Sequence, residues 1–300
     1  MKQGTETYNS VHFDEEKNRG LVTQISEIEQ RQKLILEYMI EFLSNADWNR
    51  QMRHCDIYLK LISKVRFILE SINSLLPLLR EDYRYKVSLN LLYRGVVDDL
   101  INIYYLIAFY DSRDKDQRSL ESELNILHTE FLNAFVEIHG AELKFIGVLG
   151  GNSEERGSLN ELMQRMKSEN PDLYDGDRRK KNKELRANSL LFKDSVFFEN
   201  TGMVTFISEK QKLEFISEIG RSTDILKALF KYFSQFHHFT PKTHDLQNGD
   251  IQYELQCYRL VAVEMMFTLS TLSKFIVFKD KEYALSLFSD YEQALGIQSH

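Results

Sequence analysis

The sequence predicts an all-α protein, built as an antiparallel bundle of long helices with an irregular insertion. Only 3 prolines and 13 glycines occur in 300 residues, which is too few turn-forming residues for a many-stranded sandwich or barrel. Apolar side chains recur every three or four residues through most of the chain, and this is the spacing of a helix face. We therefore expect a single helical domain at 21–300, preceded by a disordered polar tail at 1–20.

Three long helices are expected in the first part of the domain. An amphipathic helix runs from Ile25 to about Ser44, and a second runs from about 51 to 79, with Pro77 near its end. The third, at about 83–110, is apolar nearly all round, so we expect it to be the central helix of the bundle.

The second part of the chain contains an insertion and further helices. The insertion or lid, at about 147–207, combines glycines, a basic run and short apolar patches without a helical stripe. Ser208 begins a capped helix that continues through Phe233. The remaining expected helices are at about 116–146, 250–278 and 280–295.

The charge balance limits the kinds of partner. The 45 acidic residues outnumber the 38 Lys and Arg residues, and the formal net charge is -7. Broad, non-specific binding to nucleic acid or to an anionic membrane surface is therefore not expected, because both are negatively charged. Binding to either would need a local basic patch.

The cysteines and the N-terminus point to a reducing compartment. Cys55 and Cys257 both lie within apolar helical patterns, and two thiols cannot form a disulfide framework for a chain of this size. The first 20 residues lack the apolar core of a signal peptide, and charges such as Asp98 and Glu264 interrupt the most apolar stretches. We expect buried free thiols, no membrane span and a cytoplasmic location.

Arg94 and Asp98 are the first candidates for a functional site, because they lie four residues apart on the most apolar helix. Charges in such a place are retained when they are paired and hydrogen bonded. One interpretation is an ion pair within the bundle, shared with Glu264 or Arg259 of the last long helix. The other is that Arg94 lines a polar cavity and offers its donors to a phosphate or carboxylate.

The segment YFSQFHHFTP, at 232–241, contains the second group of candidates. Two adjacent histidines cannot share one face of a helix, so we expect one of His237 and His238 to point inward. The structural interpretation is a histidine that caps the helix beside one on the surface. The functional interpretation makes His238 a general base, with His237 and Ser234 contacting the ligand.

A basic run at 178–186 is a candidate surface for a nucleic-acid backbone, through Arg178, Arg179 and Lys180. The alternative is a solvated surface whose charge is neutralised by the aspartates just upstream, at 172–177.

No metal site or cofactor is expected. His237, His238, His244 and Asp245 lie close together in sequence, but their order matches no standard zinc spacing. Neither cysteine is close to them in the chain.

The stretch LLYRGVVD around Arg94 and the stretch YFSQFHHFTP around His238 together resemble motifs of bacterial helical proteins related to the HEPN superfamily. The resemblance covers about 50–110 and 210–280. It implies an antiparallel helical bundle, often dimeric, with a polar groove that many relatives use for RNA cleavage or nucleotide chemistry in defence systems. Active ribonucleases of that superfamily carry an Arg shortly before a His on one helix, and no Arg stands shortly before His237 or His238. Nuclease activity would then need Arg94 to supply the cation from another helix.

Two functions are open at this point. The first is a HEPN-like protein, homodimeric as that resemblance implies, whose polar groove binds RNA or a nucleotide in stress or phage defence. Its catalytic residues would be Arg94, Asp98 and His238. The second is a non-enzymatic interaction module, in which these residues are structural and 147–207 contacts a protein partner.

Overall fold

The structure is a computed structural model of the whole chain. It describes residues 19–112, 115, 116, 120, 138, 141, 145, 157, 158, 160, 161, 164, 165, 167, 168, 171, 174–176, 178, 179, 208–236 and 251–295. Residues of Met1–Ala108 and Glu209–His300 form one compact unit, and those of Phe109–Ser208 form a second. The expected tail at 1–20, helix at 116–146 and insertion at 147–207 lie mostly outside the described residues.

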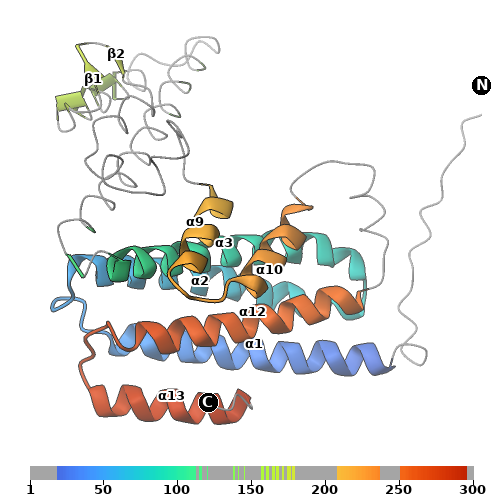
Figure 1. Cartoon of the computed structure of the whole chain (residues 1–300). Coiled ribbons are helices and arrows are strands. Elements are labelled where there is room, and N and C mark those ends of the chain that lie inside the picture. Colours follow the sequence, from blue (N-terminus) through green and yellow to red (C-terminus); the bar gives the residue numbers. More distant parts are fainter. Residues whose placement is uncertain are drawn as a thin grey trace, which may run out of the picture. The chain divides into compact units, whose positions relative to one another are not determined.

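Four long helices make up the core of the first unit (Figure 1). Short 3-10 turns, η1 (Leu76–Arg80) and η2 (Tyr83–Tyr85), join the second helix to the third. The four are α1 (Arg19–Asn45), α2 (Arg53–Leu75), α3 (Lys86–Ser112) and α12 (Gln252–Leu272).

The first three helices run up, down and up, as short connections between neighbouring helices favour. Lys64 of α2 contacts Asp99 of α3, and further along α2 the side chain of Ile68 faces Gly95, so these two helices are antiparallel. Helix α12, in contrast, runs parallel to α3. Tyr258 of α12 hydrogen bonds with Asn90 of α3, and further along both helices Thr268 hydrogen bonds with Tyr104.

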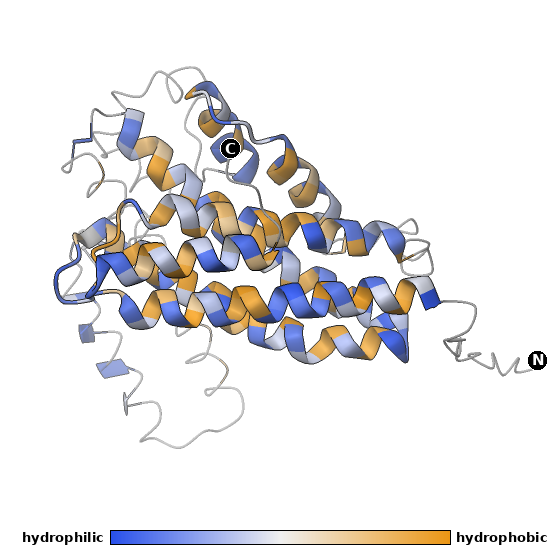
Figure 2. Cartoon of the chain, turned by 90° about the horizontal axis from the view of Figure 1, so that it is seen from below, coloured by the Kyte–Doolittle hydropathy of each residue, from blue (hydrophilic) through white to orange (hydrophobic). Residues whose placement is uncertain are grey.

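The core consists of aromatic and aliphatic side chains from all four helices. Figure 2 shows hydrophobic and hydrophilic residues interspersed along the long helices. The largest enclosed side chains include Tyr93 and Tyr258, whose rings stack with centroids 4.2 Å apart. Cys55 and Cys257 are both free and buried, as the sequence predicts. Burial raises the pKa of these thiols to about 11 and about 12 respectively, so both are inert as nucleophiles at neutral pH.

The single helix expected from Ser208 to Phe233 is wrong, because this segment forms two helices. They are α9 (Glu209–Glu218) and α10 (Asp224–Ser234). Gly220 between them has a φ of +93°, a conformation that ends a helix and that other residues rarely adopt. Ile219 and Ile225, on either side of this break, are 39% and 41% exposed.

The last helix, α13 (Lys281–Leu295), packs against α1. The ring of Tyr38 on α1 lies 5.9 Å from that of Phe288 and 5.1 Å from that of Tyr291, measured between centroids. The segment before α13 is fixed to the end of α1 by the backbone N–H of Asp47, which donates to Val277 at 2.9 Å.

In the second unit, the described residues include a small antiparallel ladder. It pairs β1 (Tyr174–Asp175) with β2 (Arg178–Arg179). Gly176 in the turn between them has a φ of +59°, which favours glycine there.

The prediction of an all-α bundle is confirmed, and five of the expected helices are present with shifted ends. Helix α2 stops before the expected residue 79, because Pro77 has no N–H to continue the α-helical ladder and the chain tightens into η1. The expected helices at 25–44, 51–79, 83–110, 250–278 and 280–295 correspond to α1, α2, α3, α12 and α13.

Candidate functional site

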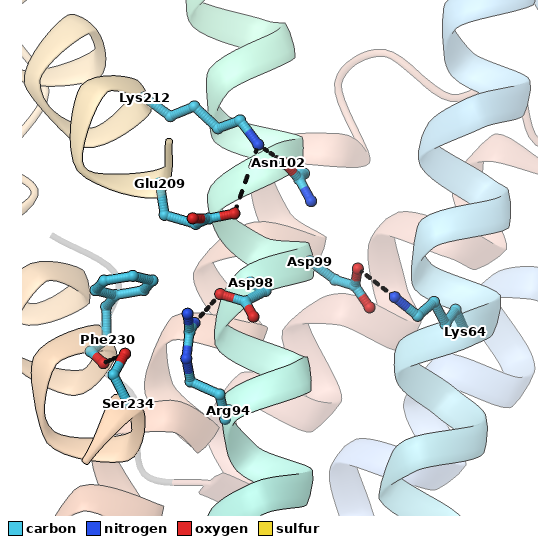
Figure 3. A network of polar contacts seen from close by, with 9 residues as sticks. All are labelled: Lys64, Arg94, Asp98, Asp99, Asn102, Glu209, Lys212, Phe230 and Ser234. Carbon is cyan, nitrogen blue, oxygen red and sulfur yellow. Dashed lines mark hydrogen bonds and ion pairs between the residues drawn. The ribbon is translucent and has the colours of Figure 1, made fainter. Parts of the chain in front are cut away.

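Arg94 and Asp98 form an ion pair on the side of α3 that faces α9 and α10 (Figure 3). Nη1 of Arg94 donates to Oδ1 of Asp98. The Arg94 side chain is 11% exposed and that of Asp98 is 32% exposed, so the pair lies at the edge of the bundle and not at its centre. Burial lowers the pKa of Arg94, and the nearby Glu209 carboxylate opposes this shift. Two carboxylates therefore stabilise a guanidinium that is mostly withdrawn from water.

Helix α10 covers this pair with an aromatic ring. The guanidinium carbon of Arg94 lies 3.9 Å from the centre of the Phe230 ring. A cation over the face of a ring is attracted by its electrons, and the ring also excludes water from one side of the guanidinium. One turn later, the Ser234 hydroxyl donates to the backbone oxygen of Phe230 at 2.6 Å. The last turn of α10 is thus placed beside the polar pair of α3.

One donor of Arg94 is unused within the described part of the chain. Its Nε is buried and has no hydrogen-bond partner there. A buried donor without a partner costs roughly 1–3 kcal/mol, so such groups are normally satisfied by water or by a ligand. The geometry therefore leaves Arg94 able to donate to one more oxygen.

A second set of contacts continues the polar face of α3 toward α9. Nζ of Lys212 donates to the amide oxygen of Asn102 at 2.7 Å and lies 3.9 Å from Oε1 of Glu209 (Figure 3). Glu209 therefore interacts with both Lys212 and Arg94. Positive and negative side chains thus alternate along this face. We call the residues that surround the guanidinium the Arg94 seam: Arg94, Asp98, Glu209, Phe230 and Ser234.

Asp99 follows Asp98 in sequence but points to the other side of α3. Its Oδ1 accepts a hydrogen bond from Nζ of Lys64 on α2 at 2.8 Å, and its side chain is only 3% exposed. Burial raises the pKa of Asp99, although Lys64 lowers it in part. This pair ties α2 to α3 and is separate from the Arg94 seam.

The expected partners of the Arg94 pair on α12 are engaged elsewhere, so that expectation is wrong. Arg259 pairs with Glu27 of α1 at 3.1 Å. Burial raises the pKa of Glu264, and the charge that lowers it belongs to Arg221. The sequence could not indicate Glu209 as the second acid, because its approach to Arg94 depends on how α9 packs against α3.

The histidine candidates cannot be placed. His237 and His238 lie outside the described residues, and the description of this segment ends at Phe236. Ser234 is described, and it precedes His237 by three positions in the chain. The metal-ligand candidates His244 and Asp245 also fall outside the described residues.

The basic run is described only at its start. Arg178 on β2 pairs with Asp175 on β1 at 3.1 Å, and their side chains are 52% and 68% exposed. One of the upstream aspartates therefore does neutralise part of the run. Arg179 is the second residue of β2, and Lys180 lies outside the described residues.

A buried polar cluster at the start of α3 was not expected from the sequence. Nζ of Lys86 lies 3.2 Å from Oε1 of Glu254, and the two side chains are 0% and 3% exposed. Beside them, the hydroxyl of Tyr258 donates to the amide oxygen of Asn90 at 2.8 Å. The signal available in the sequence was the spacing of Lys86, Asn90 and Tyr93, which puts all three on one face of α3.

The described residues set limits on other chemistry. Among them, no three or more His, Cys, Asp or Glu side chains are grouped so that they could hold a metal ion. No helix in the described ranges combines the length and the apolar character needed to cross a membrane.

The chemistry that the Arg94 seam supports is the binding of an anionic or polar group by a fixed guanidinium beside an aromatic ring. This conclusion rests on the residues of the chain itself. Comparisons with known proteins found no matching family model, no similar curated protein and no similar solved structure.

Proposed function

We propose that the Arg94 seam binds RNA or a nucleotide, and that Arg94 is the cation that holds a phosphate there. The observation that carries this proposal is the environment of the Arg94 guanidinium, which has one buried donor unused by the described residues and a ring over its face. A guanidinium can donate two parallel hydrogen bonds to a phosphate, which makes Arg the preferred residue for this task.

The neighbouring residues supply roles that fit such a ligand. Asp98 orients the guanidinium through its ion pair and competes with the ligand for the same charge. The Ser234 hydroxyl is donated to Phe230, and its oxygen keeps lone pairs that accept a hydrogen bond from a ribose or base. Three and four positions after Ser234 come His237 and His238, to which we assign ligand contact and general-base chemistry respectively.

The resemblance to HEPN-related proteins extends this proposal. It suggests a cytoplasmic role in stress or phage defence, a homodimeric assembly, and RNA as the ligand. Arg178, Arg179 and Lys180 would then contact the RNA backbone. Active ribonucleases of that superfamily carry an Arg and a His on one helix. Here an Arg from α3 and a His from the chain after α10 would replace that pair.

A second function, that of a non-enzymatic interaction module, is favoured by one observation. The residues of Phe109–Ser208 form a compact unit of their own, separate from the unit that contains the bundle helices. In this alternative the ion pairs of α3 are structural, and a protein partner binds at 147–207.

The two functions can be distinguished by incubating the purified chain with total RNA and with nucleoside triphosphates and measuring binding and turnover. The first function predicts binding that weakens steeply with salt, because phosphate contacts release counterions. Replacing Arg178, Arg179 and Lys180 by Gln should flatten that dependence, and His238→Ala should abolish any cleavage or nucleotide turnover without unfolding the chain. If the wild-type chain binds neither ligand at low salt and deletion of 147–207 removes a co-purifying protein, the interaction module is correct instead.

A further inference from the structure

The most enclosed ion pair in the described part of the chain joins the start of α3 to the start of α12. Lys86 is the first residue of α3, Glu254 lies in the first turn of α12, and the two side chains are 0% and 3% exposed. Removing two charges from water is costly, and apolar residues of similar size are often equally stable in such a place. Stability alone therefore does not explain why this position holds charges.

The pair is connected to α10 through Tyr232. The side chain of Tyr232 lies near the Glu254 carboxylate, and the pKa of Tyr232 is raised first by burial and then by the charge of this carboxylate. Its ring packs edge-on against that of Tyr253, with centroids 4.8 Å apart. The last turn of α10 is thus attached to α12 and, across the ion pair, to α3.

Stacked rings continue this attachment into the core. Phe233, the next residue of α10, stacks on Tyr93 of α3 at 5.8 Å between centroids, and Tyr93 stacks on Tyr258 of α12 at 4.2 Å. Tyr232 and Phe233 therefore set the rotation of α10 about its own axis. That rotation turns Phe230 toward Arg94 and determines where the chain leaves α10 after Ser234.

We infer that Lys86, Glu254 and Tyr232 are positioning residues, which fix the last turn of α10 beside the Arg94 seam. The role of this positioning in ligand binding rests on the proposed function, but the positioning itself can be measured without any ligand. The specific polar contact selects one rotation of α10, whereas apolar side chains in its place would allow several.

The test compares the double variant Lys86→Met/Glu254→Met with wild type by amide hydrogen exchange. We expect similar thermal midpoints, because no charge is left unpaired, together with exchange at least ten times faster at 230–236 and unchanged exchange in the middle of α2. The control variant Arg259→Met/Glu27→Met removes a more exposed ion pair of α12 and should leave 230–236 protected. Unchanged protection of 230–236 in the double variant would overturn the inference.

A second variant decides the case if the double variant does not fold. Tyr232→Phe keeps the ring and both charges and removes only the hydroxyl near Glu254, and it should also speed exchange at 230–236 at least severalfold. Protection equal to wild type in this variant would contradict the inference. Binding of a single-stranded RNA oligonucleotide by the same variants separates the two proposals. If the variants exchange faster at 230–236 but the wild-type chain binds no RNA, the positioning is correct and the proposed function is wrong.

Discussion

Phe230 lies against Arg94, with the guanidinium carbon 3.9 Å from the centre of its ring, although the two residues belong to helices that are far apart in sequence. This contact brings the end of α10 to the polar pair of α3. It also withdraws the guanidinium from water on one side and so strengthens its interactions with charged neighbours, because charges interact more strongly where water is excluded.

The first prediction compares two ion pairs that differ in burial. Asp98→Ala leaves Arg94 at a site that is partly open to water and still close to Glu209, so we expect a loss of roughly 1–2 kcal/mol in the free energy of unfolding, between the values for surface and buried pairs. Glu254→Ala strands the fully enclosed Lys86, and the loss should be roughly 3–5 kcal/mol. Urea unfolding of both variants measures the difference. Equal losses of stability, or a larger loss for Asp98→Ala, would contradict the deeper burial of the Lys86–Glu254 pair.

The second prediction concerns the turn between α9 and α10. An added Cβ at Gly220 would meet no atom within 4 Å, but the φ of +93° is unfavourable for any other residue. Gly220→Ala should therefore destabilise the chain by about 1 kcal/mol or more through the backbone alone. Gly20→Ala is the matched control: it also has open space around it, and because it lies within α1 it should not destabilise. Thermal unfolding showing no difference between the two variants would contradict the assigned turn.

The third prediction uses the pKa of Asp99. Burial raises this pKa above its ordinary value of 3.8, so the folded state binds a proton more tightly than the unfolded state does. The stability that results is present at low pH and is lost as the pH rises from about 4 through the raised pKa. Asp99→Asn removes this dependence, so the variant should gain thermal stability over wild type at neutral pH, and the gain should shrink toward pH 4. A gain that grows as the pH falls would show that the sign is wrong.

The sequence was sufficient for the long helices but not for the relations between them. The spacing of apolar residues predicts α1, α2, α3 and α12, because each buries one face against its neighbours over many turns. The same spacing failed at Gly220, where apolar residues continue in register across a turn. The positive φ of Gly220 ends the helix there, although the apolar spacing around it continues.

The candidate site was predictable in part for a similar reason. Arg94 and Asp98 stand out because charges are rare on so apolar a helix, and their pairing follows from their spacing. Glu209 and Phe230 could not be linked to them, since the contacts depend on how α9 and α10 pack against α3. Lys86 and Glu254 were missed because a charge at a helix start resembles an ordinary surface charge until the tertiary structure encloses it.

The measurement that tests the central claim most directly is the affinity of a labelled single-stranded RNA oligonucleotide for the wild-type chain, Arg94→Gln and Asp98→Asn at one fixed salt concentration. If Arg94 holds a phosphate, Arg94→Gln should weaken binding at least tenfold, and Asp98→Asn should strengthen it severalfold by removing the carboxylate that competes for the guanidinium. Arg259→Gln, on the same bundle and away from the Arg94 seam, should bind as wild type does. Equal affinities for all four proteins, or no binding by any of them, would contradict the assignment of the Arg94 seam as the ligand site.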